Sequence, residues 1–250
     1  KDLVHGLVEA LFTIDEETGM TGAFALEPGV LKGDILLNLD SEDEGELYVG
    51  CAGGMDANVT FPYKTDALPE KHLPYMIRVS GLKGGHSGLE IHLGRGNSNL
   101  VLFRLLYRAA ALNGLRLCET EGGNMRNAIP REAHAVVLIP AAQEKAFLSM
   151  AAEYAAVVKK ELAATEPDLS IACEPCEMPK RVMEPGLQKQ VIAAVYGCPN
   201  GVIRMSDGIP GLVETSTNLA IVRTEKDTVK VHCLLRSSVE PSAGNGRSGF

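Results

Sequence analysis

The stretch Tyr75–Ser80, YMIRVS, decides the fold of the larger part of the chain. Every second side chain in it is large and apolar, whereas Arg78 and Ser80 are polar. A period of two is typical of an antiparallel strand that buries one face. The same alternation returns in residues 229–236 and, less regularly, in residues 132–139. These segments predict an antiparallel sheet.

Between the predicted strands, apolar residues recur with the spacing of amphipathic helices. One set shares a helical face between residues 102 and 109, and a second set does so between residues 147 and 162. A sheet with one buried face needs helices on that face. Residues 54–238 are therefore predicted to form an α+β domain, an antiparallel sheet with helices on one side.

The first 53 residues have a different pattern. Leu7–Ile14 and Asp34–Leu39 are nearly continuous apolar runs, as expected for strands covered on both faces of a parallel sheet. Ala23–Leu31 fits a short helix or turn between them, so the segment is predicted to form a compact βαβ unit. A domain boundary is expected near Gly53, and residues 239–250, rich in Gly and Ser, are expected to be irregular.

Composition narrows the class of protein. The chain has 250 residues and a formal net charge of −8, which argues against nucleic acid or an anionic membrane surface as the main partner. No stretch approaches the ~18 apolar residues of a membrane span. Six cysteines without a secretory signal predict reduced thiols and a cytoplasmic location.

Three carboxylates follow the two predicted N-terminal strands. Glu16 and Glu17 come directly after the first strand, and Asp40 comes after the second. Ligands of open α/β sheets bind at the carboxyl ends of the strands. An exposed turn would also accept two adjacent glutamates, but three carboxylates at neighbouring strand ends favour a site.

Three polar residues of the α+β domain are further candidates. His86 lies among four glycines and could donate a hydrogen bond or a proton, although a solvated turn would look the same. Asn127 lies in an extended loop before Pro130, where an asparagine usually bonds to local backbone. Arg204 ends a short apolar strand and could bind a carboxylate, although a surface ion pair is the commoner use.

Six segments together resemble the bacterial aminoacyl-histidine dipeptidases. The resemblance covers nearly all of the chain up to about residue 238, and these carnosinase-like Xaa-His dipeptidases belong to the carboxypeptidase G2-like superfamily of dinuclear zinc peptidases. The segments are FTIDEETGMTGAFAL (12–26), ILLNLDSEDEGELYVGCAGG (35–54), GLKGGHSGLEIHLGRGNSN (81–99), GGNMRNAIPREA (122–133), PNGVIRMSD (199–207) and VHCLLRS (231–237).

The resemblance implies a fold and a metal site. Residues 1–53 would be part of a catalytic α/β domain and residues 54–238 a lid domain that dimerises. Glu16 would be the general base, and Glu17 and Asp40 would each bind one of two divalent ions, zinc before manganese or cobalt. Two such ions ~3.5–4 Å apart activate a bridging water and polarise the scissile carbonyl.

The resemblance also implies roles for the lid. His86 would stabilise the oxyanion of a dipeptide substrate, and Asn127 and Arg204 would hold its polar groups, with Arg204 on the terminal carboxylate. The family has further metal ligands, a His-x-Asp motif and a closing His, that this sequence does not contain.

We therefore expect a central piece of a longer dipeptidase that is inactive alone and exposes the apolar faces of its first strands. Two alternatives remain open at this point. One is a module that only binds or self-associates, and the other is an aminoacylase or tripeptidase with the same metal site.

Overall fold

The computed structural model describes residues 4–16, 19–39, 44–45, 48 and 50–239. The chain divides into two compact units, an N-terminal unit of residues 1–50 and a sheet unit of residues 51–250. Each unit is described by itself.

The N-terminal unit contains one regular element among its described residues, the four-residue helix α1 (Thr21–Phe24). Neither Leu7–Ile14 nor Asp34–Leu39 is a strand, and their apolar side chains are exposed, Leu7 to 90% and Phe12 to 91%. The prediction of two buried strands, and with it of an α/β unit, is wrong for the described residues. A strand exists only where neighbours accept and donate its backbone hydrogen bonds, and no described strand pairs with either run.

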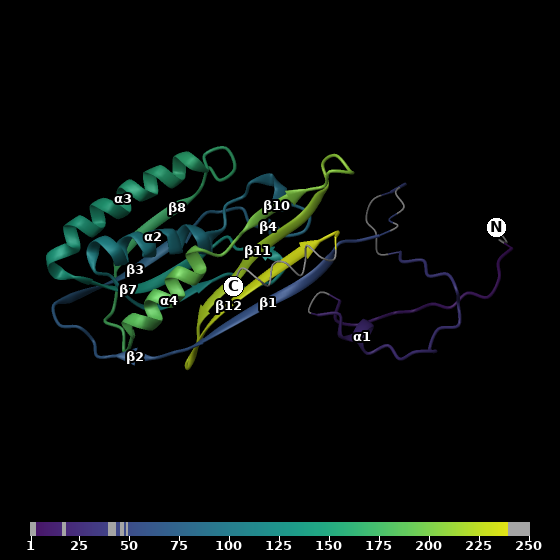
Figure 1. Ribbon diagram of the computed structural model, residues 1–250, viewed down its shortest axis with the longest axis horizontal. Coiled ribbons are helices and arrows are strands. Elements are labelled where there is room, and N and C mark those ends of the chain that lie inside the picture. The colour runs from purple at the N-terminus through teal and green to yellow at the C-terminus, as the bar shows by residue number, and fades with distance from the viewer. Residues whose placement is uncertain (1–3, 17–18, 40–43, 46–47, 49, 240–250) are drawn as a thin grey trace. The chain divides into compact units, whose positions relative to one another are not determined.

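The sheet unit is built on an eight-stranded antiparallel sheet with the order β1-β12-β11-β5-β7-β3-β8, in which β10 also pairs with β11 (Figure 1). The predicted alternating segments all lie in it. Its strands are β1 (Gly53–Pro62), β3 (His72–Ser80), β5 (Arg116–Gly122), β7 (Ala133–Pro140), β8 (Ser170–Pro175), β10 (Gly201–Met205), β11 (Val213–Thr224) and β12 (Thr228–Ser237). Two short pairs accompany it, β2 (Thr65–Asp66) with β9 (Val182–Met183) and β4 (Gly85–His86) with β6 (Ala128–Ile129).

Three helices lie on one side of this sheet, as predicted (Figure 1). They are α2 (Ser98–Asn113), α3 (Glu144–Glu161) and α4 (Pro185–Tyr196), with single 3₁₀ turns at Ile91–Leu93 and Ala141–Gln143. The predicted apolar faces of α2 and α3 are buried in one core with Ile77 and other inward residues of the sheet. No helix among the described residues has the length and apolarity that crossing a bilayer would require.

The register of the sheet explains the alternation in the sequence. Ile77 of β3 lies opposite Ala135 of β7, and both are fully buried. Arg78 lies opposite His134 on the other face, which the helices do not cover. A short segment of β11 departs from this regularity, because a bulge shifts the register with β12 between Leu219 and Ile221.

Candidate functional site

His86 lies in the short strand β4, opposite Ala128 of β6. Its ring Nδ1 accepts a hydrogen bond from the backbone N–H of Leu89 at 3.1 Å. A ring nitrogen that accepts carries no proton, so the neutral imidazole has its proton on Nε2. Burial lowers the pKa of His86, and the charge of Arg236 lowers it further against the opposing effect of Glu90. The acceptor role of Nδ1 and the lowered pKa both favour the neutral ring with its proton on Nε2.

Hydrogen bonds to Glu90 and from Arg95 fix the turn around His86. Glu90 accepts the backbone N–H of His86 at 2.7 Å and pairs with Arg95 at 2.6 Å, and Arg95 also donates to the carbonyl of Gly84. Gly85 has a φ of +143°, and a Cβ there would collide with both Glu90 and Arg95. A side chain at residue 85 would be strained by this φ and would displace the ends of Glu90 and Arg95, so glycine suits the position before His86.

Asn127 is adjacent to His86 through the backbone. Its carbonyl accepts the N–H of Ser87 at 2.8 Å, which ties the loop before β6 to the turn after β4. His86 and Asn127 also line the same cavity of about 820 Å³, together with the cross-strand residues Arg78, His134 and Arg223. The structure therefore brings together two of the residues that the sequence singled out.

Arg236 is a site residue that the sequence reasoning missed. A Cβ built on Gly88 would lie 3.0 Å from Cε1 of His86 and 3.1 Å from Cζ of Arg236, so both side chains flank this glycine. The Nε atom of Arg236 is buried without a hydrogen-bond partner, and burial together with Arg126 lowers the pKa of its guanidinium. A half-buried guanidinium whose Nε lacks a partner, beside an imidazole that can donate from Nε2, suits a carboxylate.

A signal for Arg236 was present in the sequence. It interrupts the apolar run Cys233–Leu235 of the segment VHCLLRS, which the resemblance already used. The periodicity of β12 places this arginine on the face away from the helices.

Arg204 has a different environment. It lies in β10, pairs with Asp207 and comes within 3.6 Å of Glu214, while its side chain stays 55% exposed. These carboxylates raise the pKa of Arg204, Asp207 first. In this structure its charge is already neutralised, as in the surface ion pair that the sequence left open.

The predicted metal site is not assembled in the described part of the chain. Glu16 is exposed and lies outside any strand, and Glu17 and Asp40 lie outside the described residues. Across the residues that the structure describes, no group of three or more His, Cys, Asp or Glu side chains converges as metal ligands would. The described residues do not form a metal centre by themselves.

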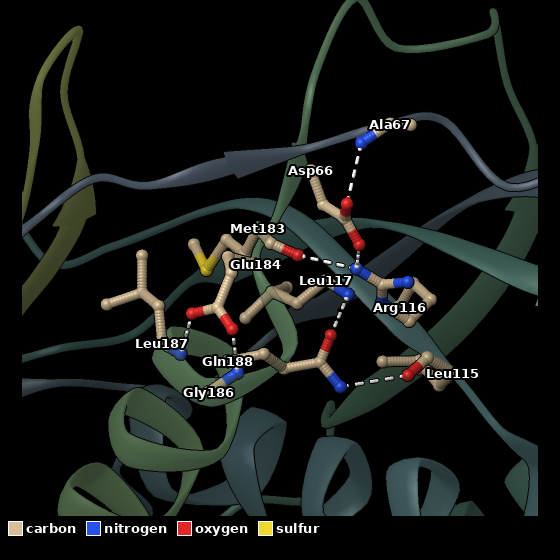
Figure 2. Close-up of polar contacts among 10 residues, drawn as sticks. All are labelled: Asp66, Ala67, Leu115, Arg116, Leu117, Met183, Glu184, Gly186, Leu187 and Gln188. Carbon is tan, nitrogen blue, oxygen red and sulfur yellow. Dashed lines mark hydrogen bonds and ion pairs between the residues drawn. The ribbon is translucent and has the colours of Figure 1, made fainter.

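A second polar cluster, at the opposite end of β5, has a structural role (Figure 2). Gln188 of α4 accepts the N–H of Leu117 at 2.7 Å and donates to the carbonyl of Leu115 at 2.9 Å. Arg116 donates to the carbonyl of Met183 and to Asp66. These bonds attach α4 and the β2–β9 pair to the sheet. Within the cluster, the Nε atom of Arg116 is buried without a hydrogen-bond partner.

The chain was compared with known proteins on this basis. Residues 77–166 match the family model of the peptidase dimerisation domain. The chain is 41% identical over 240 residues to a cytosol non-specific dipeptidase of Escherichia coli, covering 96% of this chain and 50% of that protein. It also superposes on the crystal structure of an aminoacylhistidine dipeptidase from Vibrio alginolyticus with a TM-score of 0.84 and 47% identity, covering 94% of this chain and 48% of the other.

The resemblance is confirmed. This chain is related to dipeptidases and spans about half the length of the relatives it matches. The antiparallel sheet with helices agrees with the matched structure over nearly the whole chain.

Proposed function

We propose that this chain takes part in the metal-dependent hydrolysis of dipeptides, preferentially Xaa-His, within a protein of the length of its relatives. The observation that supports this most directly is the neutral imidazole of His86 beside Arg236, in a chain 47% identical to an aminoacylhistidine dipeptidase. The imidazole N–H donor and the guanidinium cation flank the same glycine, Gly88. Such a pair suits a scissile carbonyl and a substrate carboxylate. The name of the E. coli relative supports a cytoplasmic location.

In this proposal His86 stabilises the oxyanion through Nε2–H, and Asn127 orients the substrate from the neighbouring loop. Glu16 acts as general base, and Glu17 and Asp40 bind divalent metal, zinc before manganese or cobalt. When bound, such ions would activate a water and polarise the scissile carbonyl. The residues 1–53 belong to the catalytic domain and 54–238 to the lid. Because two carboxylates without imidazole bind such metals weakly, the isolated chain is expected to be inactive.

The first test measures β-Ala-His and Gly-His hydrolysis by a protein of the relatives' length, with and without a chelator. His86→Gln should lower kcat about 10²–10³-fold, the usual loss for one oxyanion donor, and the chelator should abolish turnover. Unchanged kcat in His86→Gln would reject the oxyanion role. Faster turnover of tripeptides or N-acyl amino acids than of dipeptides would instead favour the tripeptidase or aminoacylase alternative.

The second test decides which arginine binds the substrate carboxylate. The sequence favours Arg204, whereas the geometry favours Arg236, whose Nε lacks a partner. Losing a hydrogen bond to a charged group costs about 1.5–3 kcal/mol, so the correct Arg→Gln variant should raise KM about 10- to 150-fold. The other variant should leave KM nearly unchanged, and equal effects of both would reject the assignment.

Self-association is a second candidate function, which the match of residues 77–166 to a peptidase dimerisation domain favours. In the described sheet, β1, β8 and β10 each pair with a single neighbouring strand, and an open edge is a pairing surface. We propose a homodimer of this chain. Light scattering over a concentration series should give twice the mass of 26.7 kDa, and a monomer at every concentration would contradict it.

A further inference from the structure

Asn218 connects the sheet to the loop that carries Asn127. It lies in β11 on the face away from the helices, opposite Leu234 of β12, and is only 1% exposed. Its Nδ2 donates to the carbonyl of Ala128 at 2.8 Å and to that of Arg126 at 3.4 Å. One buried amide therefore holds the backbone on both sides of Asn127.

The chain of hydrogen bonds continues from Asn127 to His86. The carbonyl of Asn127 accepts the N–H of Ser87, the residue that follows His86. The register places Ser216, two residues before Asn218 on the same face, opposite Arg236. One short segment of β11 thus bonds the loop of Asn127, which is tied to the turn of His86, and pairs with β12 at Arg236.

Asn218 is a costly choice for a strand. Asparagine is depleted in strands, and its Oδ1 is buried here without a hydrogen-bond partner. The buried hydroxyls of Ser87 and Thr217 also lack partners. A β-branched residue would fit the sheet at lower cost, and groups that break such local rules in native proteins cluster at functional sites.

We propose that Asn218 is a positioning residue, which sets the orientation of the His86 ring by fixing the backbone around Asn127. The inference rests on the proposed function of His86. It goes beyond that function because it assigns the orientation of the His86 ring to a residue that does not touch the substrate.

The test compares two variants of Asn218 with one matched control. Asn218→Leu keeps the volume but removes the donor, and Asn218→Asp keeps the shape but places an acceptor against two carbonyls. Gln188→Leu is the control, because it also removes a buried amide that bonds two backbone groups, at the far end of β5 (Figure 2). All three should lower the free energy of unfolding.

Only the Asn218 variants should change His86. Nitrogen NMR of the imidazole in the full chain reports its tautomer and its pKa, and we expect both to shift in Asn218→Leu and Asn218→Asp but not in Gln188→Leu. In the dipeptidase assay the Asn218 variants should lose about tenfold or more in kcat, with a smaller change in KM, as expected for a misplaced group. Should Asn218→Leu fail to fold, Asn218→Asp carries the comparison.

Two negative outcomes are distinguishable. If a protein of the relatives' length hydrolyses no dipeptide with or without these substitutions, the proposed function fails, while the imidazole NMR still decides whether Asn218 sets the orientation of His86. If wild type is active and the His86 signals in the Asn218 variants match those in Gln188→Leu, Asn218 is merely structural and the inference is overturned.

Discussion

Similar apolar runs are exposed in the N-terminal unit of this chain and buried in its sheet unit. In the N-terminal unit the run around Phe12 is exposed and forms no strand. In the sheet unit Ile77 is fully buried and β3 is hydrogen-bonded on both sides, by β7 and β8. Both runs are rich in large apolar residues.

The difference shows that an apolar run is not sufficient to form a strand. The run also needs neighbouring strands that pair with its backbone. Each backbone amide of a strand needs an acceptor, and each apolar face needs a cover. Within the sheet unit both needs are met by segments far apart in the sequence, such as β1 with β12. For the runs at residues 7–14 and 34–39, the described part of the chain supplies no partner strand, and their large apolar side chains are exposed.

The largest expected contrast is in hydrogen exchange. Amides of residues 7–14 and 34–39 should exchange at rates close to those of an unfolded chain, because their opening free energy is near zero. Amides of β7 and of the buried half of β5 should be slower by about 10³-fold or more, approaching the global stability. Exchange measured by mass spectrometry on the full chain checks this. Strong protection of residues 7–14 would show that the apolar run finds partners in solution.

A matched pair of phenylalanines tests the same contrast by substitution. Phe103 of α2 is fully buried and Phe12 is 91% exposed. Phe103→Ala should lower the free energy of unfolding by about 3–5 kcal/mol, through lost transfer energy and a cavity. Phe12→Ala should change it by less than about 0.5 kcal/mol. Denaturant unfolding of both variants checks this, and comparable losses would mean that Phe12 is packed.

The sequence predicted the structure correctly where a periodic apolar pattern belongs to an element whose apolar face is buried against other elements. The alternation in β3 and β12 and the apolar faces of α2 and α3 predicted the sheet with helices on one side. These patterns are local, and the core satisfies them. The run at residues 7–14 misled because its pattern states only what the strand would bury, not whether a neighbour is present.

The candidate site was predictable in part. His86 and Asn127 lie in short segments with distinctive glycine and proline residues, and the structure brings them together. The sequence marks Arg236 only as a polar residue at the end of an apolar run and does not mark Asn218, because the importance of both depends on cross-strand register and on which polar atoms remain unpaired. The sequence favoured Arg204 for the substrate carboxylate, but its ion pairs with Asp207 and Glu214 depend on the fold and were not visible in the sequence.

The N-terminal caps of α1 and α2 differ between the two units, and we expect a smaller effect on the free energy of unfolding from them. The side chain of Asn97 caps α2 by accepting the N–H groups of Asn99 and Leu100, whereas Met20 begins α1 without a side-chain cap. Asn97→Ala should therefore cost about 1–2 kcal/mol of unfolding free energy, and Met20→Ala should cost nearly nothing. Asn97→Asp, which keeps the capping acceptor, should recover part of the loss. No recovery would mean that the donor bond from Asn97 to the carbonyl of Leu219 matters more than the cap.

The smallest effect concerns the charge beside His86. Burial lowers the pKa of this imidazole first and Arg236 lowers it second, while Glu90, which is paired with Arg95, raises it. Arg236→Gln removes a positive charge that disfavours the imidazolium, so the pKa should rise but stay below its ordinary value because the burial remains. Glu90→Gln should move it further down. NMR titration of the full chain checks both signs. A fall of the pKa in Arg236→Gln would show that the guanidinium does not lie beside the ring, and would remove the geometric reason for preferring Arg236 over Arg204.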